Sequence, residues 1–201
     1  MRLYQLFEDL TQVSGLSYQQ YWDVKRKKIS NEAILKFHLG YDQNRIHNFL
    51  ADWMILIEAP PYLALDSSFT GIPAFLDKLK QHADLYVCTA RQFRQPAMDQ
   101  LARLNLLHNF KQVLVTEQRQ SKVSLIESYV SSLSERDWLV GDTGKDIQAG
   151  KLLNIKTCAV LSGFLNEKAL QSYEPDWIIE SVTSFSPADI CLNINYLQEL
   201  A

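Results

Sequence analysis

Trp138-Leu139-Val140-Gly141-Asp142-Thr143-Gly144-Lys145-Asp146 is the stretch of sequence that decides the fold of this chain. Its apolar start predicts a short buried strand, and Gly141 predicts a sharp turn where that strand ends. Two carboxylates, Asp142 and Asp146, then follow four residues apart. We expect both to project into the crevice beyond the strand, where oxygen ligands suit Mg²⁺.

A simpler role for each of these acids stays open. Asp142 could cap the helix that follows, because an aspartate before a helix accepts backbone N–H bonds. Asp146 could be a solvated acid in the first helical turn. The strand, the glycine and both acids agree with one another, and this agreement favours the metal site.

Beyond Asp66 the sequence alternates between strand and helix patterns. Apolar runs predict short strands at residues 85–89, 112–116, 137–140, 156–161 and 177–179. Helical patterns lie before and between them, at residues 71–80, 96–107, 122–133 and 146–153. Repeated units of this kind predict an α/β fold, with a Rossmann-like, mostly parallel sheet covered by helices on both faces. Ligands of such sheets bind beyond the carboxyl ends of the strands.

The first part of the chain has a different pattern. Apolar residues there recur at helical spacing, with no strand pattern before about Pro60. Small or polar residues at 14–15, 29–31 and 40 predict breaks between helices. We therefore predict a small helical-bundle domain at residues 1–64 and an α/β core domain at residues 65–201.

Composition narrows the class of protein. The 201 residues are 47% hydrophobic and carry a net charge of −3, which gives no sign of a nucleic-acid partner. We expect no membrane segment and a cytoplasmic protein, because there is no secretory leader pattern and no long apolar run. The three cysteines are widely spaced, so neither a disulfide framework nor a zinc site is indicated.

Polar residues also follow the strands before Trp138. Thr89 ends the strand at 85–89, and Lys122 begins the helix after the strand at 112–116. A hydroxyl with backbone N–H groups can hold phosphoryl oxygens, and a lysine can neutralise their charge. Carboxylates can hold a metal ion that bridges to the phosphate. We therefore expect a phosphate site whose binding residues are Thr89, Ala90, Arg91 and Lys122.

In these motifs the chain resembles the haloacid dehalogenase-like superfamily, in particular its phosphoglycolate-phosphatase-like branch with a helical cap. Residues 87–91 are similar to the second motif of that family, Lys122 to the third and residues 141–146 to the fourth. The resemblance implies a Mg²⁺-dependent hydrolase of small phosphate monoesters that works through an aspartyl-phosphate, with residues 1–64 as the cap.

The same resemblance implies roles for the site residues. Thr89 and Lys122 would hold the phosphoryl group. Asp142 would bind Mg²⁺. Asp146 would bind the metal directly or through water, and would orient Lys122 as a second catalytic group.

The family's first motif, Asp-x-Asp-x-Thr, has no clear counterpart in this chain. That motif follows an N-terminal strand and supplies the nucleophile, whereas residues 2–7 resemble the first cap helix. Residues 63–70 imitate it and offer Asp66 as a substitute nucleophile, but they fit the return from cap to core better.

The absent motif also affects the expected sheet. In the family its strand lies between the strands that end here at Thr89 and Gly141. Each interior backbone group left unpaired costs about 1–3 kcal/mol. We therefore expect those two strands to pair directly, or another segment or a second copy of the chain to fill the gap.

Other functions remain open from the sequence. The chain could be a shortened or naturally disarmed phosphatase, or a catalytically inactive phosphate- or metal-binding protein that regulates or scaffolds. A dehalogenase ranks third, because its chemistry does not require the Mg²⁺ site. The basic run at residues 25–28 could reach an anionic tail of a substrate, although such runs are usually solvated.

Overall fold

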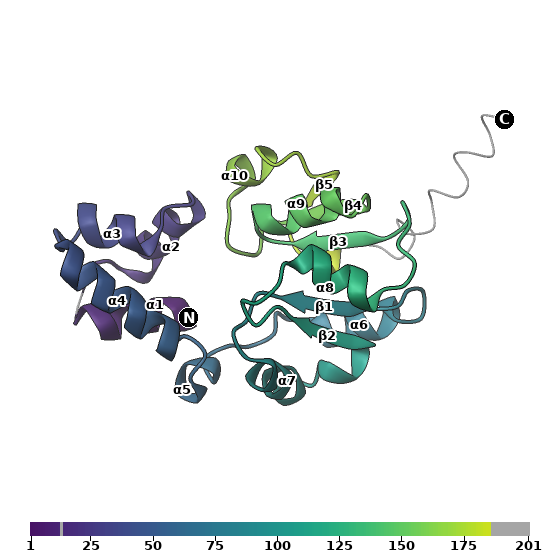
Figure 1. Cartoon of the computed structure of the whole chain (residues 1–201), viewed down its shortest axis with the longest axis horizontal. Helices are drawn as coiled ribbons and strands as arrows, with labels where there is room; N and C mark the ends of the chain where they lie inside the picture. The colour runs from purple at the N-terminus through teal and green to yellow at the C-terminus, as the bar shows by residue number, and fades with distance from the viewer. Residues whose placement is uncertain (13, 186–201) are drawn as a thin grey trace.

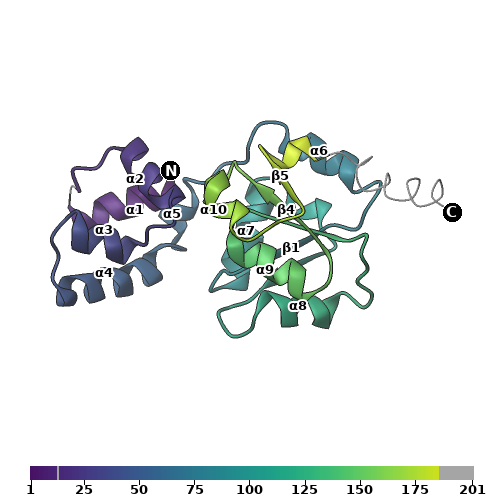
Figure 2. The same cartoon turned by 90° about the horizontal axis from the view of Figure 1, so that it is seen from above.

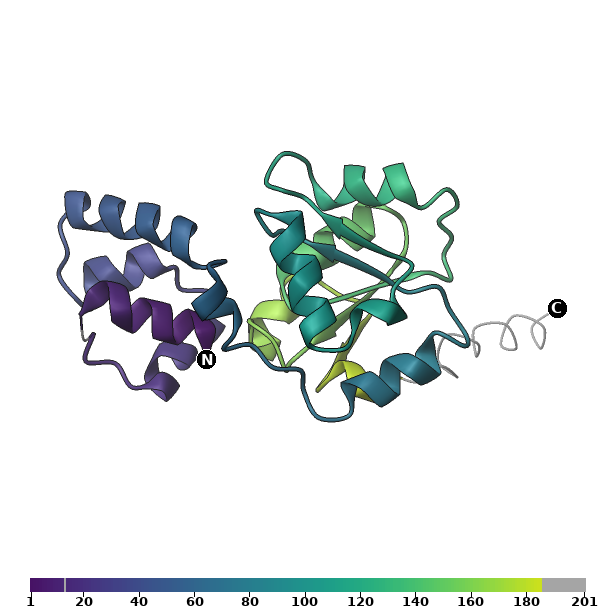
Figure 3. The ribbon, with the colours of Figure 1, turned by 90° about the horizontal axis from the view of Figure 1, so that it is seen from below.

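The structure is a computed structural model that describes residues 1–12 and 14–185. A helical bundle and an α/β part lie side by side, and the chain passes from one to the other after α5 (Figure 1). The views from above and below show the same arrangement (Figures 2 and 3). No helix in the described part of the chain is long and apolar enough to cross a membrane.

The bundle has the helical pattern that the sequence predicts. Its helices are α1 (Arg2–Thr11), α2 (Tyr18–Arg26), α3 (Asn31–Phe37), α4 (Gln43–Leu56) and the short α5 (Pro60–Leu63). The side chains of Ser17, Ser30 and Asp42 cap α2, α3 and α4 by accepting backbone N–H bonds. Aromatic and aliphatic residues from four helices form its core: Phe7, Tyr21, Ile34, Leu35, Ile46 and Phe49.

Within the described residues, the α/β part has five strands, each within one residue of its predicted bounds. They are β1 (Tyr86–Thr89), β2 (Gln112–Val115), β3 (Trp138–Gly141), β4 (Lys156–Val160) and β5 (Trp177–Ile179). The helices are α6 (Ile72–Leu79), α7 (Arg94–Arg103), α8 (Lys122–Tyr129), α9 (Gly144–Leu152) and α10 (Glu167–Gln171). Short 3₁₀ turns, η1 (Leu107–Asn109) and η2 (Val182–Ser184), complete the elements.

Two predicted helices are shorter than expected. The prediction for α7 ran to residue 107, but the helix ends at Arg103, and Asn105 adopts a left-handed backbone conformation with φ of 55°. Asparagine tolerates that conformation better than most residues, and it stops a helix. The prediction for α8 ran to residue 133, but Val130 is already extended.

Helices cover both faces of the strands, as predicted. Leu114 of β2 packs against Leu125 and Ile126 of α8. Its neighbours Val113 and Val115 point to the other face and pack with Ala97 of α7. This alternation follows from the two-residue period of a strand. Every strand pair is parallel, so the α/β fold class is confirmed.

The sheet is divided in two. β1 pairs with β2, and β3 pairs with β4, which also pairs with β5. The expectation that β1 and β3 pair directly is wrong, and no described segment forms a strand between them. Among the described residues, the inner edges of β1 and β3 therefore keep backbone groups without a strand partner.

Candidate functional site

Asp142 and Asp146 lie at the carboxyl end of β3, as predicted, but only Asp146 takes part in capping. Asp142 directly follows β3, and Asp146 lies in the first turn of α9. The helix cap is Thr143, whose backbone N–H and hydroxyl donate to Asp146 Oδ2 at 3.1 and 2.7 Å. Asp142 is therefore left for another role.

Asp142 is half-buried, and its carboxylate is held by a hydrogen bond from the backbone. Its Oδ2 accepts the backbone N–H of Phe164 at 2.8 Å, and the backbone N–H of Asp142 itself also stabilises the carboxylate. Burial raises the pKa of Asp142, and the charge of Asp146 adds to the rise, while Phe164 N–H and Lys122 oppose it. A nearby cation would stabilise this charge, so Asp142 can hold a hard metal ion.

Asp146 is only 5% exposed, and its second oxygen pairs with Lys122. Lys122 begins α8 after the loop that leaves β2, so this ion pair joins the ends of two separate strands. Both oxygens of Asp146 are thus engaged within the chain, Oδ1 by Lys122 and Oδ2 by Thr143. In the described part of the chain no group of three acidic, histidine or cysteine side chains is arranged for a metal.

Gly141 is required because Asp146 approaches it closely. Its φ is not among the positive values of the chain, so the bend that follows at residues 142–143 does not use the left-handed conformation that favours glycine. A Cβ built on Gly141 would instead lie 2.4 Å from the Cβ of Asp146. Gly163, which the sequence reasoning missed, is packed against Asp142 in the same way, at 2.1 Å. The sequence feature that could have identified Gly163 is its position just after the predicted strand at residues 156–161.

Thr89 and Ala90 lie at the carboxyl end of β1. Thr89 is half-buried and Ala90 is exposed. The hydroxyl of Thr89 makes no hydrogen bond within residues 1–12 and 14–185, so it is available to a ligand. Burial raises the pKa of the neighbouring Cys88 thiol, and the charges of Lys122 and Asp146 also act on it. Electrostatically, the ion pair therefore acts on the end of β1.

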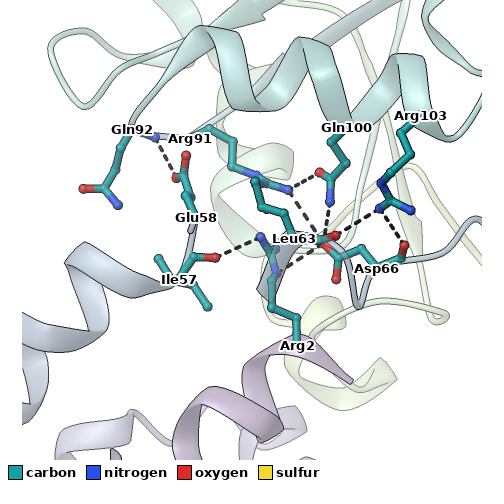
Figure 4. A network of polar contacts seen from close by, with 9 residues as sticks. All are labelled: Arg2, Ile57, Glu58, Leu63, Asp66, Arg91, Gln92, Gln100 and Arg103. Atoms are coloured by element: carbon teal, nitrogen blue, oxygen red, sulfur yellow. Dashed lines mark hydrogen bonds and ion pairs between the residues drawn. The ribbon is translucent and has the colours of Figure 1, made fainter. Parts of the chain in front are cut away.

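Asp66 and Arg91 belong to a different network, at the junction of the bundle and the α/β part (Figure 4). Asp66 Oδ2 is 3.2 Å from Arg2 Nε and accepts the side-chain N–H of Gln100 at 2.7 Å. Arg91 Nη2 donates to Gln100 Oε1 at 2.6 Å and lies 3.9 Å from Asp66 Oδ2. Among the described residues no hydrogen bond or ion pair joins Asp66 to Lys122, Asp142 or Asp146.

The contacts of Arg91 with Gln100 and Asp66 were not predicted from the sequence. Its Nη2 is held in the junction, but its Nη1 is buried and has no hydrogen-bond partner in the described structure. A buried guanidinium nitrogen without an acceptor is costly. One nitrogen of Arg91 thus lies buried in the junction without an acceptor among the described residues.

A family model decides the family of the chain. The model described as haloacid dehalogenase-like hydrolase matches residues 6–160, which is most of the chain. The chain belongs to the haloacid dehalogenase-like hydrolase family. No curated protein matches its sequence.

Solved structures of this family share its fold. A candidate phosphatase from Clostridium difficile has a TM-score of 0.69 at 16% identity, covering 90% of this chain and 86% of its own. A predicted phosphoglycolate phosphatase from Haemophilus somnus has a TM-score of 0.66 at 14% identity, with 95% and 89% covered. A magnesium-bound hydrolase of the family from Bacillus subtilis has a TM-score of 0.57 at 17% identity, with 91% and 86% covered.

Proposed function

We propose that this haloacid dehalogenase-like protein binds Mg²⁺ and a small phosphate monoester at the carboxyl ends of β1, β2 and β3, and that it is a phosphatase. The observation that carries the proposal is the Lys122–Asp146 ion pair, together with the half-buried carboxylate of Asp142 directly after β3. A lysine, and a carboxylate that can bind a hard metal ion, are suited to a phosphate when both lie at the carboxyl ends of the strands.

Each side chain has a distinct role in this proposal. Asp142 would hold the metal, while Phe164 N–H fixes its carboxylate through Oδ2. Asp146 keeps Lys122 aimed at the phosphoryl oxygens, and Thr143 in turn fixes Asp146. The hydroxyl of Thr89, at the carboxyl end of β1, is a further donor for the phosphate. The bound metal would supply neutralisation of the phosphoryl charge.

Hydrolysis also needs a nucleophile, and the side chains of Asp146 and Asp66 are both held by other residues. Asp146 is held by Lys122 and Thr143, and Asp66 is held by Arg2 and Gln100. This observation favours a second candidate function, in which the site binds phosphate and metal without turnover and the protein acts as a regulatory or interaction partner.

Hydrolysis of p-nitrophenyl phosphate with and without Mg²⁺ separates the two candidates. Wild type, Lys122→Met and a control, Lys145→Met, are compared, because Lys145 is an exposed lysine of the same motif. Mg²⁺-dependent turnover that is lost in Lys122→Met and kept in Lys145→Met supports the phosphatase. Phosphate binding that needs Mg²⁺ but gives no turnover supports the binding protein. Absence of both binding and turnover contradicts both.

A further inference from the structure

A cavity of about 260 Å³ lies at the amino ends of β1 and β2. Its walls come from the end of α6, from η1 and from the residues that lead into the two strands, among them Leu85 before β1 and Lys111 before β2. The proposed phosphate site lies at the carboxyl ends of the same strands. The four residues of β1 span about 13 Å at a rise of about 3.3 Å per residue, so the cavity is separate from that site.

Asn109, in the wall of this cavity, has a side-chain amide without a hydrogen-bond partner. The residue is 5% exposed, and its Oδ1 and Nδ2 are both buried and unpaired in the described structure. Exchanging the two atoms, which are hard to tell apart in an asparagine, pairs neither of them. No other side chain in the described ranges has both a donor and an acceptor buried in this way. A buried polar group of this kind calls for a ligand or a water.

The backbone around Asn109 is held on two sides. Leu106 packs in one cluster with Ile72 of α6, and Leu107 packs against the cluster of Val113 on the other side. The backbone N–H of Asn109 donates to the carbonyl of Leu106 at 3.1 Å. Moving the amide out to bulk water would disturb both clusters, so its partner has to come to it.

The charged side chains of the cavity walls have partners of their own. The Nζ of Lys80 lies 2.7 Å from Asp77 Oδ1, and Lys111 pairs with Asp84. The Nε2 of His108 lies 3.6 Å from the same oxygen of Asp77. The walls therefore combine paired charges with an unpaired neutral amide, and this combination favours a neutral polar ligand over an ion.

The amide determines which edge such a ligand needs. An asparagine presents a donor beside an acceptor, and it pairs with a planar group that offers an acceptor beside a donor. The amino group and neighbouring ring nitrogen of adenine form such an edge. Phe110 adds an aromatic side chain to the wall, which suits a flat ring. The volume is slightly below the roughly 300–1,000 Å³ of sites for drug-sized ligands, so it suits a molecule of one or two rings.

We propose that this cavity is a second ligand site, in which Asn109 binds a small, neutral, planar heterocycle through one donor and one acceptor. The site lies at the opposite end of β1 and β2 from the proposed phosphate site. It does not depend on that site or on turnover.

Isothermal titration calorimetry with 9-methyladenine and 9-methylpurine tests the inference. Both probes are neutral, flat and nearly equal in size, and neither carries a phosphate. Only 9-methyladenine has an amino group beside a ring nitrogen, and the methyl group removes the ring N–H from both. The proteins are wild type, Asn109→Leu and Asn48→Leu. Asn48 is a matched control, because it is an exposed asparagine in α4.

We expect wild type to bind 9-methyladenine about tenfold more tightly than 9-methylpurine, the effect of a lost donor–acceptor pair. Asn109→Leu removes that difference, whereas Asn48→Leu keeps it. Equal or undetectable binding of both probes to wild type overturns the inference and leaves the cavity to water, since its volume holds several molecules.

A competition experiment locates the probe. Inorganic phosphate with Mg²⁺ should leave the binding of 9-methyladenine in place, and displacement would assign the probe to the carboxyl ends of the strands and overturn the inference. Asn109→Ala replaces Asn109→Leu if circular dichroism shows that the latter is unfolded. The comparison of the two probes on wild type needs no variant.

Discussion

Lys122 and Asp146 form an ion pair that joins the starts of α8 and α9, and the Asp146 side chain is only 7% exposed. The pair carries charge into the space beyond β1, β2 and β3, and Asp142 lies beside it. A buried carboxylate is costly unless it is paired and hydrogen-bonded, and Asp146 satisfies both conditions. The lysine therefore has a fixed position before any ligand binds, which is the preorganisation that a phosphate site needs.

Loss of Lys122 should destabilise the fold as well as the site. Lys122→Met leaves the buried Asp146 carboxylate without its cation, so we expect the free energy of unfolding to fall by about 1–3 kcal/mol. Urea denaturation measures this change. The exposed Lys145→Met is the control and should change stability by less than about 0.5 kcal/mol. Equal free energies of unfolding of the two variants would show that the ion pair does not contribute to the stability of the fold.

A side chain at Gly141 should displace Asp146. Since a Cβ there would lie 2.4 Å from the Cβ of Asp146, Gly141→Ala must shift the start of α9 or the end of β3. We expect a loss of about 1–3 kcal/mol in unfolding free energy, the usual cost of overpacking, together with weaker phosphate binding. The neighbouring Val140→Ala, at a more exposed position, should cost less. Wild-type stability and binding in Gly141→Ala would disprove the close approach.

Lys25→Met should stabilise the protein at neutral pH. The folded-state pKa of Lys25 is about 8 and its ordinary value is 10.5, so the folded state disfavours the ammonium. The penalty is fully present below pH 8 and disappears as pH rises toward 10.5, because the unfolded chain then holds more protons. We expect the free energy of unfolding of Lys25→Met to be about 1–3 kcal/mol higher than that of wild type at pH 7.

That advantage should shrink between about pH 8 and pH 10 in urea denaturation. Tyr21, the titratable neighbour that shares Asn31 with Lys25, has its pKa raised by burial, so it remains neutral in this range. An advantage independent of pH, or a destabilised Lys25→Met, would show that burial of the lysine is not costly and that its contacts fasten the bundle.

Because the sheet is divided, we predict that its strands differ in the rate of backbone amide hydrogen exchange. The inner edges of β1 and β3 have no strand partner among the described residues, whereas β4 is paired on both sides. We expect backbone amides in β1 and β3 to exchange with deuterium faster than those of Thr157, Cys158 and Ala159 in β4, which are almost fully buried. Equal protection in all three strands would mean that another segment or a second copy of the chain pairs with the open edges.

The strands were predictable because each is a short apolar run followed by a polar residue, a local signal that needs no tertiary information. Thr89, Lys122, Asp142 and Asp146 were predictable for the same reason, since each lies at or just after a strand end or at a helix start. Gly141 shows the limit of this reasoning. The residue was identified, but its close contact with Asp146 depends on tertiary geometry.

Contacts between the bundle and the α/β part could not be predicted from local patterns. Lys25 stands within a basic run that normally indicates a solvated surface, yet it is buried against Phe164, 139 positions later in the chain. Arg91 was expected to hold phosphate, and the structure places its Nη2 in the junction with Gln100. Both outcomes depend on how two separately patterned parts of the chain pack together.

In the proposed function, Asp142 and Lys122 build one site for Mg²⁺ and phosphate. Calorimetric titration of inorganic phosphate into wild type and Asp142→Asn, each with and without Mg²⁺, tests this most directly. Asparagine preserves the size of the side chain and can still accept Phe164 N–H, so only the charge is removed. We predict that phosphate binds wild type more tightly with Mg²⁺ and that Asp142→Asn loses this Mg²⁺ dependence. Identical Mg²⁺ dependence in both proteins would contradict the account.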